Sequence, residues 1–282
     1  MEVLVATRDG IAGLPGRDVG ALAVDAGRVW AVVDGRELWR RDGDWSFVAG
    51  WDGAVLTCVA ASGEDVIVGT DEAHVLTRSG QSLVVDEAFD RLPERTAWYT
   101  PWGGPASTRS MARDNGVVLV NVHVGGIARR DAGGPWRALV DIDVDVHQVA
   151  VAPDRSLLAA TGAAGFGRSI DGGETWEWDS EGLRGSYCRA VAVAGEQVLL
   201  TASTGPGARE GAVYRRPLGD KGAWQRVTDF AKGNIDTYWV ATLGDTAAYV
   251  TGDGAVWISH NAGGSWDHLS DVTATPRAVA LV

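Results

Sequence analysis

Pairs of short apolar strands recur along the chain in a constant frame. Residues 149–160 read VAVAPDRSLLAA, and residues 191–202 read VAVAGEQVLLTA. Each stretch reads as a strand, a tight turn and a second strand, apolar on both faces as expected where neighbours cover both sides. The same frame recurs at 23–33, 59–69, 111–122 and 240–251. A third strand usually follows, and a fourth tends to open with a tryptophan: Trp45, Trp136, Trp176, Trp224 and Trp266.

Repeats of four short strands are typical of β-propellers. Six repeats are complete, and the two ends of the chain supply a seventh, because residues 277–282 match a first strand and residues 2–7 a second. A blade shared by both termini closes the ring without an open sheet edge. We therefore predict an all-β, seven-bladed β-propeller that forms a single domain over residues 1–282. Six blades are the alternative, if the first or second repeat is misread.

A turn motif recurs between third and fourth strands. It reads SIDGGETW at 169–176 and SHNAGGSW at 259–266, with a weaker copy, RRDAGGPW, at 129–136. In the first copy Asp171 can accept hydrogen bonds from nearby backbone N–H groups, while Gly172 and Gly173 allow the positive φ of a tight reversal. The motif resembles the Asp-box, or BNR repeat, of sialidase-like β-propellers. The resemblance implies the fold, and it places these turns away from the ligand face.

Composition narrows the class of partner and the compartment. Acidic residues outnumber basic ones and give a formal charge of −12, which argues against nucleic acid and anionic membrane surfaces as partners. The N-terminus lacks the basic segment and apolar run of a secretion signal, and no stretch is long enough to span a membrane. Two cysteines, Cys58 and Cys188, fit a reducing compartment. We therefore predict a cytoplasmic protein.

An insertion at 89–106 interrupts the repeats and carries Trp98 and Trp102. A loop of this length in a compact domain is usually functional. We predict that it covers the mouth of the central channel and that both tryptophans contribute to substrate binding. The alternative is an aromatic plug over the channel.

In propellers of this kind, the first strand of each blade lines the channel. Aligning the repeats places one residue of each first strand at an equivalent position near the channel mouth: Ala21, Thr57, Arg109, His147, Arg189, Tyr238 and Arg277. Guanidinium groups around one axis suit a carboxylate or phosphate, whose oxygens they bind in pairs. The predicted substrate-binding residues are Arg109, Arg189, Arg277, Tyr187, Asp236, Trp98 and Trp102. In the alternative, Asp145 and Asp236 neutralise the arginines in an ion-pair network.

His147 follows Asp141, Asp143 and Asp145, which would alternate with it along one face of an extended segment. A carboxylate beside an imidazole suits general acid and base catalysis. The predicted catalytic residues are His147, His123, Asp145 and Tyr238. The same His123, Asp145 and His147 could instead hold a divalent metal, since the two histidines come from adjacent repeats. No other cofactor is indicated.

True sialidases use three arginines and a tyrosine, which Arg109, Arg189, Arg277 and Tyr238 resemble. The chain lacks the Arg-Ile-Pro signature, a secretion signal and a glutamate placed beside Tyr238, so sialidase activity is not predicted. Two functions remain. One is a cytoplasmic enzyme of hydrolase or lyase type, acting on a small anionic substrate in an axial pocket. The other is a non-catalytic propeller that binds a protein partner, similar to photosystem assembly propellers. The axial polar ring favours the enzyme.

Overall fold

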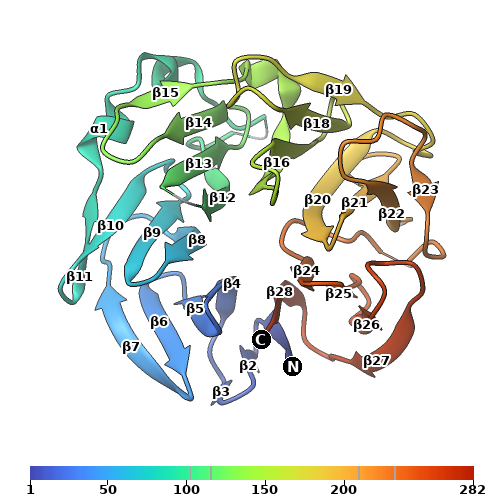
Figure 1. The fold of residues 1–282 in the computed structure, drawn as a ribbon. Helices are drawn as coiled ribbons and strands as arrows, with labels where there is room; N and C mark the ends of the chain where they lie inside the picture. Colours follow the sequence, from blue (N-terminus) through green and yellow to red (C-terminus); the bar gives the residue numbers. More distant parts are fainter. Residues whose placement is uncertain (102, 115, 209, 232) are drawn as a thin grey trace.

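The computed structural model describes residues 1–101, 103–114, 116–208, 210–231 and 233–282. Short β-strands account for most of this chain, and their sheets surround a central axis (Figure 1). Among the described residues, the strands form five four-stranded sheets and one eight-stranded sheet. The protein is therefore an all-β propeller.

The two ends of the chain share one sheet, as the sequence predicts. Its strands, in order across the sheet, are β28 (Pro276–Leu281), β1 (Val3–Thr7), β2 (Gly10–Ile11) and β3 (Leu14–Pro15). β28 runs antiparallel to β1, with Val279 opposite Val5. Both termini consequently lie close together in the ring (Figure 1).

The eight-stranded sheet consists of two antiparallel meanders placed edge to edge. One contains β4 (Val19–Asp25), β5 (Arg28–Val33), β6 (Glu37–Asp42) and β7 (Asp44–Gly50); the other contains β8 (Leu56–Ser62), β9 (Asp65–Thr70), β10 (Val75–Ser79) and β11 (Ser82–Val85). They join where Ser82 pairs in parallel with Gly50. The predicted count of separate blades is therefore wrong. The described residues contain five separate four-stranded blades, not seven or six, because the outer strands of two repeats merge into one sheet.

The other four sheets each contain four consecutive strands. They are β12 (Thr108–Asp114), β13 (Val117–Val122), β14 (Gly126–Arg130) and β15 (Trp136–Ala138); β16 (Val146–Val151), β17 (Leu157–Thr161), β18 (Phe166–Ser169) and β19 (Glu177–Asp179); β20 (Tyr187–Ala194), β21 (Gln197–Ser203), β22 (Ala212–Pro217) and β23 (Gln225–Arg226); and β24 (Val240–Leu243), β25 (Thr246–Val250), β26 (Ala255–Ser259) and β27 (Asp267–Asp271).

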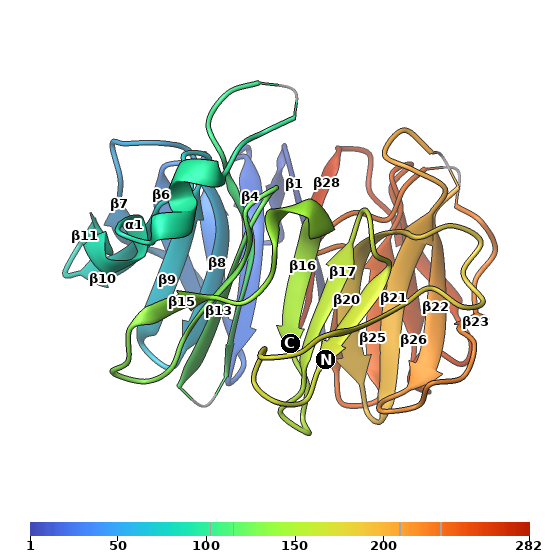
Figure 2. The same ribbon diagram turned by 90° about the horizontal axis from the view of Figure 1, so that it is seen from above.

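In the described part of the chain, three short helical turns interrupt the strands: α1 (Glu87–Asp90), the 3-10 turn η1 (Pro93–Ala97) and the 3-10 turn η2 (Ile142–Val144). α1 and η1 overlap the predicted insertion, and the loop after η1 rises above one face of the ring (Figure 2). None of the helices in the described ranges is long and apolar enough to cross a membrane.

The core lies between neighbouring sheets, which explains why the inner strands are apolar on both faces. In β5, Trp30 and Val32 pack into one hydrophobic cluster, whereas Ala31 and Val33 pack into another. Successive side chains of a strand point to opposite faces, so each face of β5 meets a different neighbour. A polar residue on either face would consequently have to lose its contact with water.

The turn motif at 169–176 forms the hydrogen bonds that its residues predict. The Asp171 carboxylate accepts hydrogen bonds from the Thr175 hydroxyl and from the Thr175 backbone N–H at 3.0 Å, and these bonds lower the pKa of Asp171 to about 2. The buried Ser169 hydroxyl accepts a hydrogen bond from the Gly173 N–H at 2.8 Å. These bonds hold the reversal from β18 to β19.

The second copy of the motif repeats these contacts, and the third does not. Asn261 accepts a hydrogen bond from the Ser265 N–H at 2.9 Å in the place that Asp171 has in the first copy. In the third copy, Arg129 stands where the others have serine, and its guanidinium donates to Asp131 at 2.6 Å. The carboxylate is therefore bound by a side chain in place of the turn hydroxyl.

Candidate functional site

The innermost strands carry a β-bulge at matching positions near one end. In six of the seven described inner strands, the pairing with the next strand of the blade slips there by one residue, whereas β24 pairs with β25 without a shift. A bulge leaves a residue out of the ladder and redirects its side chain. The bulged residues are Gly20, Thr57, Arg109, His147 and Arg277, and in β20 Arg189 with Ala190 lies opposite a single residue of β21. The repeat alignment therefore identifies the position correctly in five strands. It is wrong in β4, where Gly20 is bulged and the predicted Ala21 is buried in the core.

Tyr238 differs from the prediction because it does not lie on an inner strand. It occupies the turn before β24 with φ of 63°, a conformation that bulky residues rarely adopt. Its backbone N–H donates to the side-chain oxygen of Gln148 at 2.9 Å, and its hydroxyl accepts from the Met111 N–H at 2.7 Å. Burial raises the pKa of Tyr238 well above its ordinary value. The side chain thus reaches across the ring to β12, and its hydroxyl is occupied by backbone.

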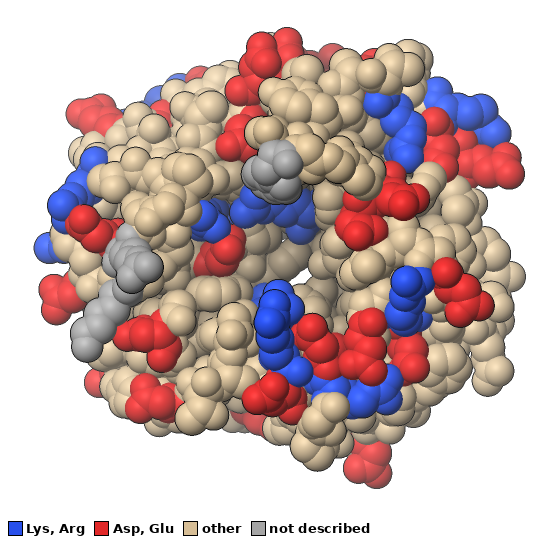
Figure 3. Space-filling model, turned by 180° about the vertical axis from the view of Figure 1, so that it is seen from behind, with Lys and Arg blue, Asp and Glu red and all other residues tan. Residues whose placement is uncertain are grey.

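A cavity of about 390 Å³ opens at the axis of the ring. Its lining includes Gly20, Thr57, Arg109, His123, Asp236 and Arg277. Seen from the side opposite to that of Figure 1, the molecule has a central hollow with basic and acidic side chains around it (Figure 3). Polar groups from several blades therefore meet at the axis.

Asp236 bridges two of the predicted substrate-binding arginines. Its Oδ1 lies 3.3 Å from Nη2 of Arg109, and its Oδ2 lies 2.8 Å from Nη1 of Arg189. Burial opposes ionisation of Asp236, but the charges of Arg189 and Arg109 together outweigh it and lower the pKa of this carboxyl. The ion-pair network that the sequence offered as an alternative is thus present around Asp236.

Each of these arginines also has a further partner. Arg109 Nε donates to the Thr237 hydroxyl at 3.2 Å, and Arg189 Nη2 donates to the Pro206 carbonyl at 2.8 Å. The Nε atom of Arg189 has no hydrogen-bond partner among the described residues. Both guanidiniums are therefore fixed in position while donor capacity remains.

Arg277 pairs with a different carboxylate from the one that binds the other two arginines. Its Nη2 donates to Asp18 at 3.3 Å. Sequence reasoning missed Asp18, although a signal was present: Asp18 precedes the bulged Gly20 by two residues, as Asp145 precedes His147. Choosing Ala21 in place of Gly20 displaced the alignment by one residue and hid this relation.

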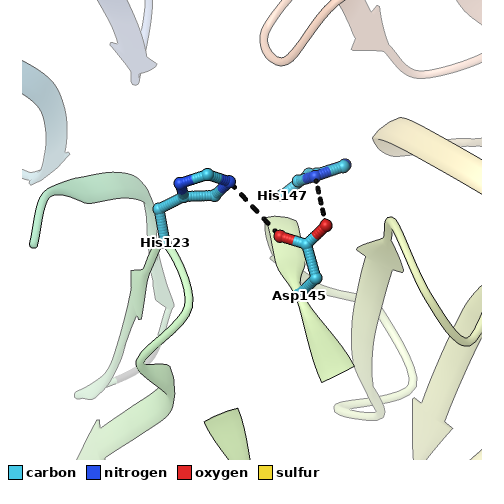
Figure 4. A group of neighbouring side chains, drawn as sticks. All are labelled: His123, Asp145 and His147. Atoms are coloured by element: carbon cyan, nitrogen blue, oxygen red, sulfur yellow. Dashed lines mark ion pairs between the residues drawn. The ribbon is translucent and has the colours of Figure 1, made fainter. Parts of the chain in front are cut away.

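His123, Asp145 and His147 converge beside the axis (Figure 4). Nε2 of His123 lies 3.2 Å from Oδ1 of Asp145, and Nε2 of His147 lies 3.3 Å from Oδ2 of the same carboxylate. His123 follows β13 directly, whereas His147 is the bulged residue of β16. Two neighbouring blades therefore supply the two imidazoles, with one carboxylate between them.

The predicted alternation of carboxylates before His147 is wrong. Residues 142–144 form η2, and the Asp141 carboxylate accepts from the Asp143 N–H at its start. Asp145 then adopts a left-handed conformation, with φ of 52° and ψ of 63°. The chain reverses at Asp145 instead of running extended, so this carboxylate alone of the three reaches His147.

His147 is fully buried and its ring is oriented by backbone. Nδ1 lies 2.6 Å from the carbonyl oxygen of Cys188. A carbonyl only accepts hydrogen bonds, so Nδ1 carries the proton and Nε2 faces Asp145. Burial lowers the pKa of His147. For Asp145 burial acts against ionisation, but its contacts with His123 and His147 outweigh this effect, and the pKa stays well below the ordinary value.

Gly162 makes room for the carboxylate and was missed by sequence reasoning. A Cβ atom on Gly162 would lie 2.1 Å from Oδ2 of Asp145 and 2.9 Å from Cε1 of His147. Gly162 follows β17 directly, as His123 follows β13, so the two residues hold equivalent places in adjacent repeats. Aligning the two repeats would therefore have identified Gly162, because it stands at the position that His123 has in the preceding blade.

The remaining predicted site residues divide between the axis and the insertion. The Tyr187 ring lies 4.8 Å from that of His147, and the Arg189 guanidinium lies 5.2 Å from its centroid. Trp98 packs on Phe89 at 5.5 Å, within a hydrophobic cluster. Trp102 lies outside the described residues. Tyr187 thus joins the axial group, whereas Trp98 contributes to packing.

We expect the stabilising contribution of Asp236 to depend on pH. The folded-state pKa is lowered, so this contribution is complete above the unfolded-state value of about 3.9 and is lost as the pH falls through the folded value. Urea unfolding of wild type and Asp236→Asn should therefore differ most near neutral pH, and the difference should narrow below about pH 4. The exposed Asp143→Asn serves as the control. A constant difference from pH 7 to pH 3 would contradict the assignment.

No family model and no curated protein matches the chain. Solved structures match in fold. The WD40 β-propeller domain of Doa1 superposes with a TM-score of 0.68 at 15% identity, covering 98% of this chain and 87% of that domain. Virginiamycin B lyase from Staphylococcus aureus gives a TM-score of 0.60 at 11% identity, covering 95% and 88% of the two chains. The GH74 enzyme of Niastella koreensis superposes with a TM-score of 0.62 at 14% identity, and the match covers 89% of this chain and 45% of that enzyme.

These similarities establish the class of protein. The neighbours include a lyase, a glycoside hydrolase family enzyme and a WD40 domain, and all three share the propeller fold with this chain. At such low identity the likeness extends to the fold alone, since unrelated functions occur on one fold. The function must be argued from the axial residues.

Proposed function

We propose that the protein is an enzyme of hydrolase or lyase type that binds a small anionic molecule, a carboxylate or a phosphate, in its axial cavity. One observation carries the proposal. Bulges in three successive inner strands direct Arg109, His147 and Arg189 toward the axis, where the carboxylate of Asp145 also lies. Bulges that redirect side chains are over-represented next to active sites.

The arginines would bind the anion. Asp236 holds both guanidiniums in place without occupying all of their N–H groups, and the Nε atom of Arg189 is unpaired among the described residues. Fixed donors lose little conformational freedom when an anion binds. Tyr187, packed between Arg189 and His147, would form one wall of the binding site.

The histidines would act on protons of the bound substrate. Asp145 lies between the two imidazoles, and the Cys188 carbonyl fixes the orientation of His147. A buried imidazole oriented by a carboxylate and a carbonyl suits general acid and base catalysis. Elimination and hydrolysis both need such a proton transfer, which is why we propose these two reaction types.

We further propose that the protein is distantly related to Asp-box propellers and that it is located in the cytoplasm. The hydrogen bonds of the turns at 169–176 and 259–266 support a distant relation to Asp-box propellers. Cys58 and Cys188 are both buried and unpaired, which supports the cytoplasm as the location.

The proposal is tested by calorimetric titration with inorganic phosphate and with small mono- and dicarboxylates. Arg189→Ala should weaken binding of the anion tenfold or more, because a charge-assisted contact is lost. Arg91→Ala removes an exposed arginine far from the axis and should bind as wild type does. Unchanged binding in Arg189→Ala, with a large loss of stability, would show that the arginines serve the ion-pair network. No binding of any anion by wild type would favour a partner-binding propeller.

A further inference from the structure

We infer that His123, Asp145 and His147 form a binding site for a divalent transition-metal ion, with Zn²⁺ as the best match. One ligand atom from each residue lies within 4.8 Å of the others. The role of this metal in catalysis rests on the proposed function, whereas its binding stands on the geometry of the three side chains alone.

The separations between the ligand atoms match those around a tetrahedral metal. Zinc binds histidine nitrogen and carboxylate oxygen at about 2.0–2.2 Å, so two ligands of one tetrahedron lie about 3.3–3.5 Å apart. Each imidazole lies close to this distance from one oxygen of Asp145: Nε2 of His123 is 3.2 Å from Oδ1, and Nε2 of His147 is 3.3 Å from Oδ2.

The arrangement around His147 indicates that a cation is the missing partner. Nδ1 donates to the Cys188 carbonyl, which leaves a lone pair on Nε2 that faces the Asp145 carboxylate. Nε2 of His147 has no hydrogen-bond partner among the described residues. His147 has no exposed surface, so water does not satisfy its nitrogen from the outside. A positive charge between this buried nitrogen and Oδ2 of Asp145, 3.3 Å away, would stabilise both groups.

The surroundings hold the three ligands as metal sites usually do. A metal-binding histidine commonly donates its other ring N–H to a backbone carbonyl, which fixes the tautomer and orients the ring. His147 has this contact with Cys188 at 2.6 Å. On the other side, Gly162 donates its N–H to the Asp145 carbonyl at 2.8 Å and leaves space for the carboxylate.

The donor types decide between classes of metal. Two imidazole nitrogens and one carboxylate oxygen suit zinc and the neighbouring divalent transition metals, whereas magnesium and calcium prefer oxygen throughout. Three protein ligands leave a fourth position for water or substrate, as in catalytic zinc sites. We therefore expect Zn²⁺ to bind more tightly than Mg²⁺ or Ca²⁺.

A metal ion would also favour the anion binding that we propose for the axial site. Arg109 and Arg189 are balanced in formal charge by Asp145 and Asp236, so with neutral histidines these four groups sum to zero. A divalent ion at the three ligands would give the axial group a net charge of plus two. Anion affinity should therefore be higher in the metal-loaded protein.

The test is titration of chelator-treated, full-length protein with ZnCl₂ by calorimetry, supported by the visible spectrum of the Co²⁺-substituted protein. We expect one Zn²⁺ per chain and an intense Co²⁺ spectrum of the tetrahedral type. His147→Ala and Asp145→Asn should each weaken Zn²⁺ binding at least tenfold. His260→Ala removes an exposed histidine outside the axis and should retain wild-type affinity. Circular dichroism of each variant verifies the fold.

The outcomes separate this inference from the proposed function. Absence of Zn²⁺ binding by wild type, or equal affinity in folded His147→Ala, overturns the metal site, even if phosphate still binds through the arginines. Stoichiometric Zn²⁺ binding that depends on His147 and Asp145 supports the site, even if phosphate fails to bind in the presence of zinc. Zn²⁺ binding without phosphate binding would thus support the metal site and contradict the proposed anionic substrate.

Discussion

Replacing Tyr238 by alanine is expected to lower the free energy of unfolding by about 3 kcal/mol, the range of large-to-small substitutions at packed aromatic residues. The Tyr238 ring packs against two hydrophobic clusters on different sides of the ring of blades. Its hydroxyl also accepts the Met111 N–H of β12, which would be left without a partner. Equilibrium unfolding in urea measures the change.

Tyr238→Phe separates the two contributions. It retains the ring and removes only the hydroxyl, so we expect a loss of about 1–2 kcal/mol from the unpaired Met111 N–H. If Tyr238→Ala lost less than about 1 kcal/mol, the contact across the ring would not contribute to stability as described. Loss of anion binding in a fully stable Tyr238→Phe protein would instead return the hydroxyl to the predicted catalytic group.

Replacing Gly162 by alanine is expected to weaken Zn²⁺ binding at least tenfold while the protein remains folded. The new methyl group would stand 2.1 Å from Oδ2 of Asp145, so the carboxylate must turn away from His147. Gly162 does not have a positive φ, so alanine fits the backbone. Loss of an orienting contact beside a metal ligand typically costs ten- to a hundredfold in affinity. Calorimetric titration with ZnCl₂ measures the effect.

Gly205→Ala is the matched control for this change. Gly205 has no positive φ, and a Cβ atom there would meet nothing within 4 Å. It should therefore bind Zn²⁺ as wild type does. Wild-type affinity in Gly162→Ala as well would show that Asp145 is not a ligand in the position described.

Much of the ring of blades could be predicted from the sequence because the apolar pattern that produces each blade lies within a short stretch of chain. The apolar pairs such as 149–160 and 191–202 need cover on both faces, and their spacing leaves few architectures that supply it. The join between β7 and β11 could not be predicted in this way. It rests on one parallel pair, Ser82 with Gly50, and such a contact between strand ends leaves no hydrophobic pattern.

The candidate site was predictable in its residue types and not in its geometry. Matching positions in the repeats identified Arg109, His147 and Arg189, because polar residues stand there where packing alone would select valine or alanine. Asp145 takes its left-handed conformation at the end of the 3-10 turn η2, and Tyr238 is held in its turn by Gln148 of another blade. A single sequence does not show such contacts.

The bulges of the inner strands create two kinds of position in each repeat: residues that are paired in the ladder and a residue that is not. Residues within the ladder, such as Val146 and Gln148, maintain the pairing to the next strand, whereas the bulged residue between them has no place in it. An exchange at a bulged residue that lines the cavity, such as Thr57 or Arg277, therefore changes the cavity wall without removing a residue from the ladder. Six such positions surround one axis in the described chain, so new binding preferences can be selected there one substitution at a time while the ring that carries them stays the same.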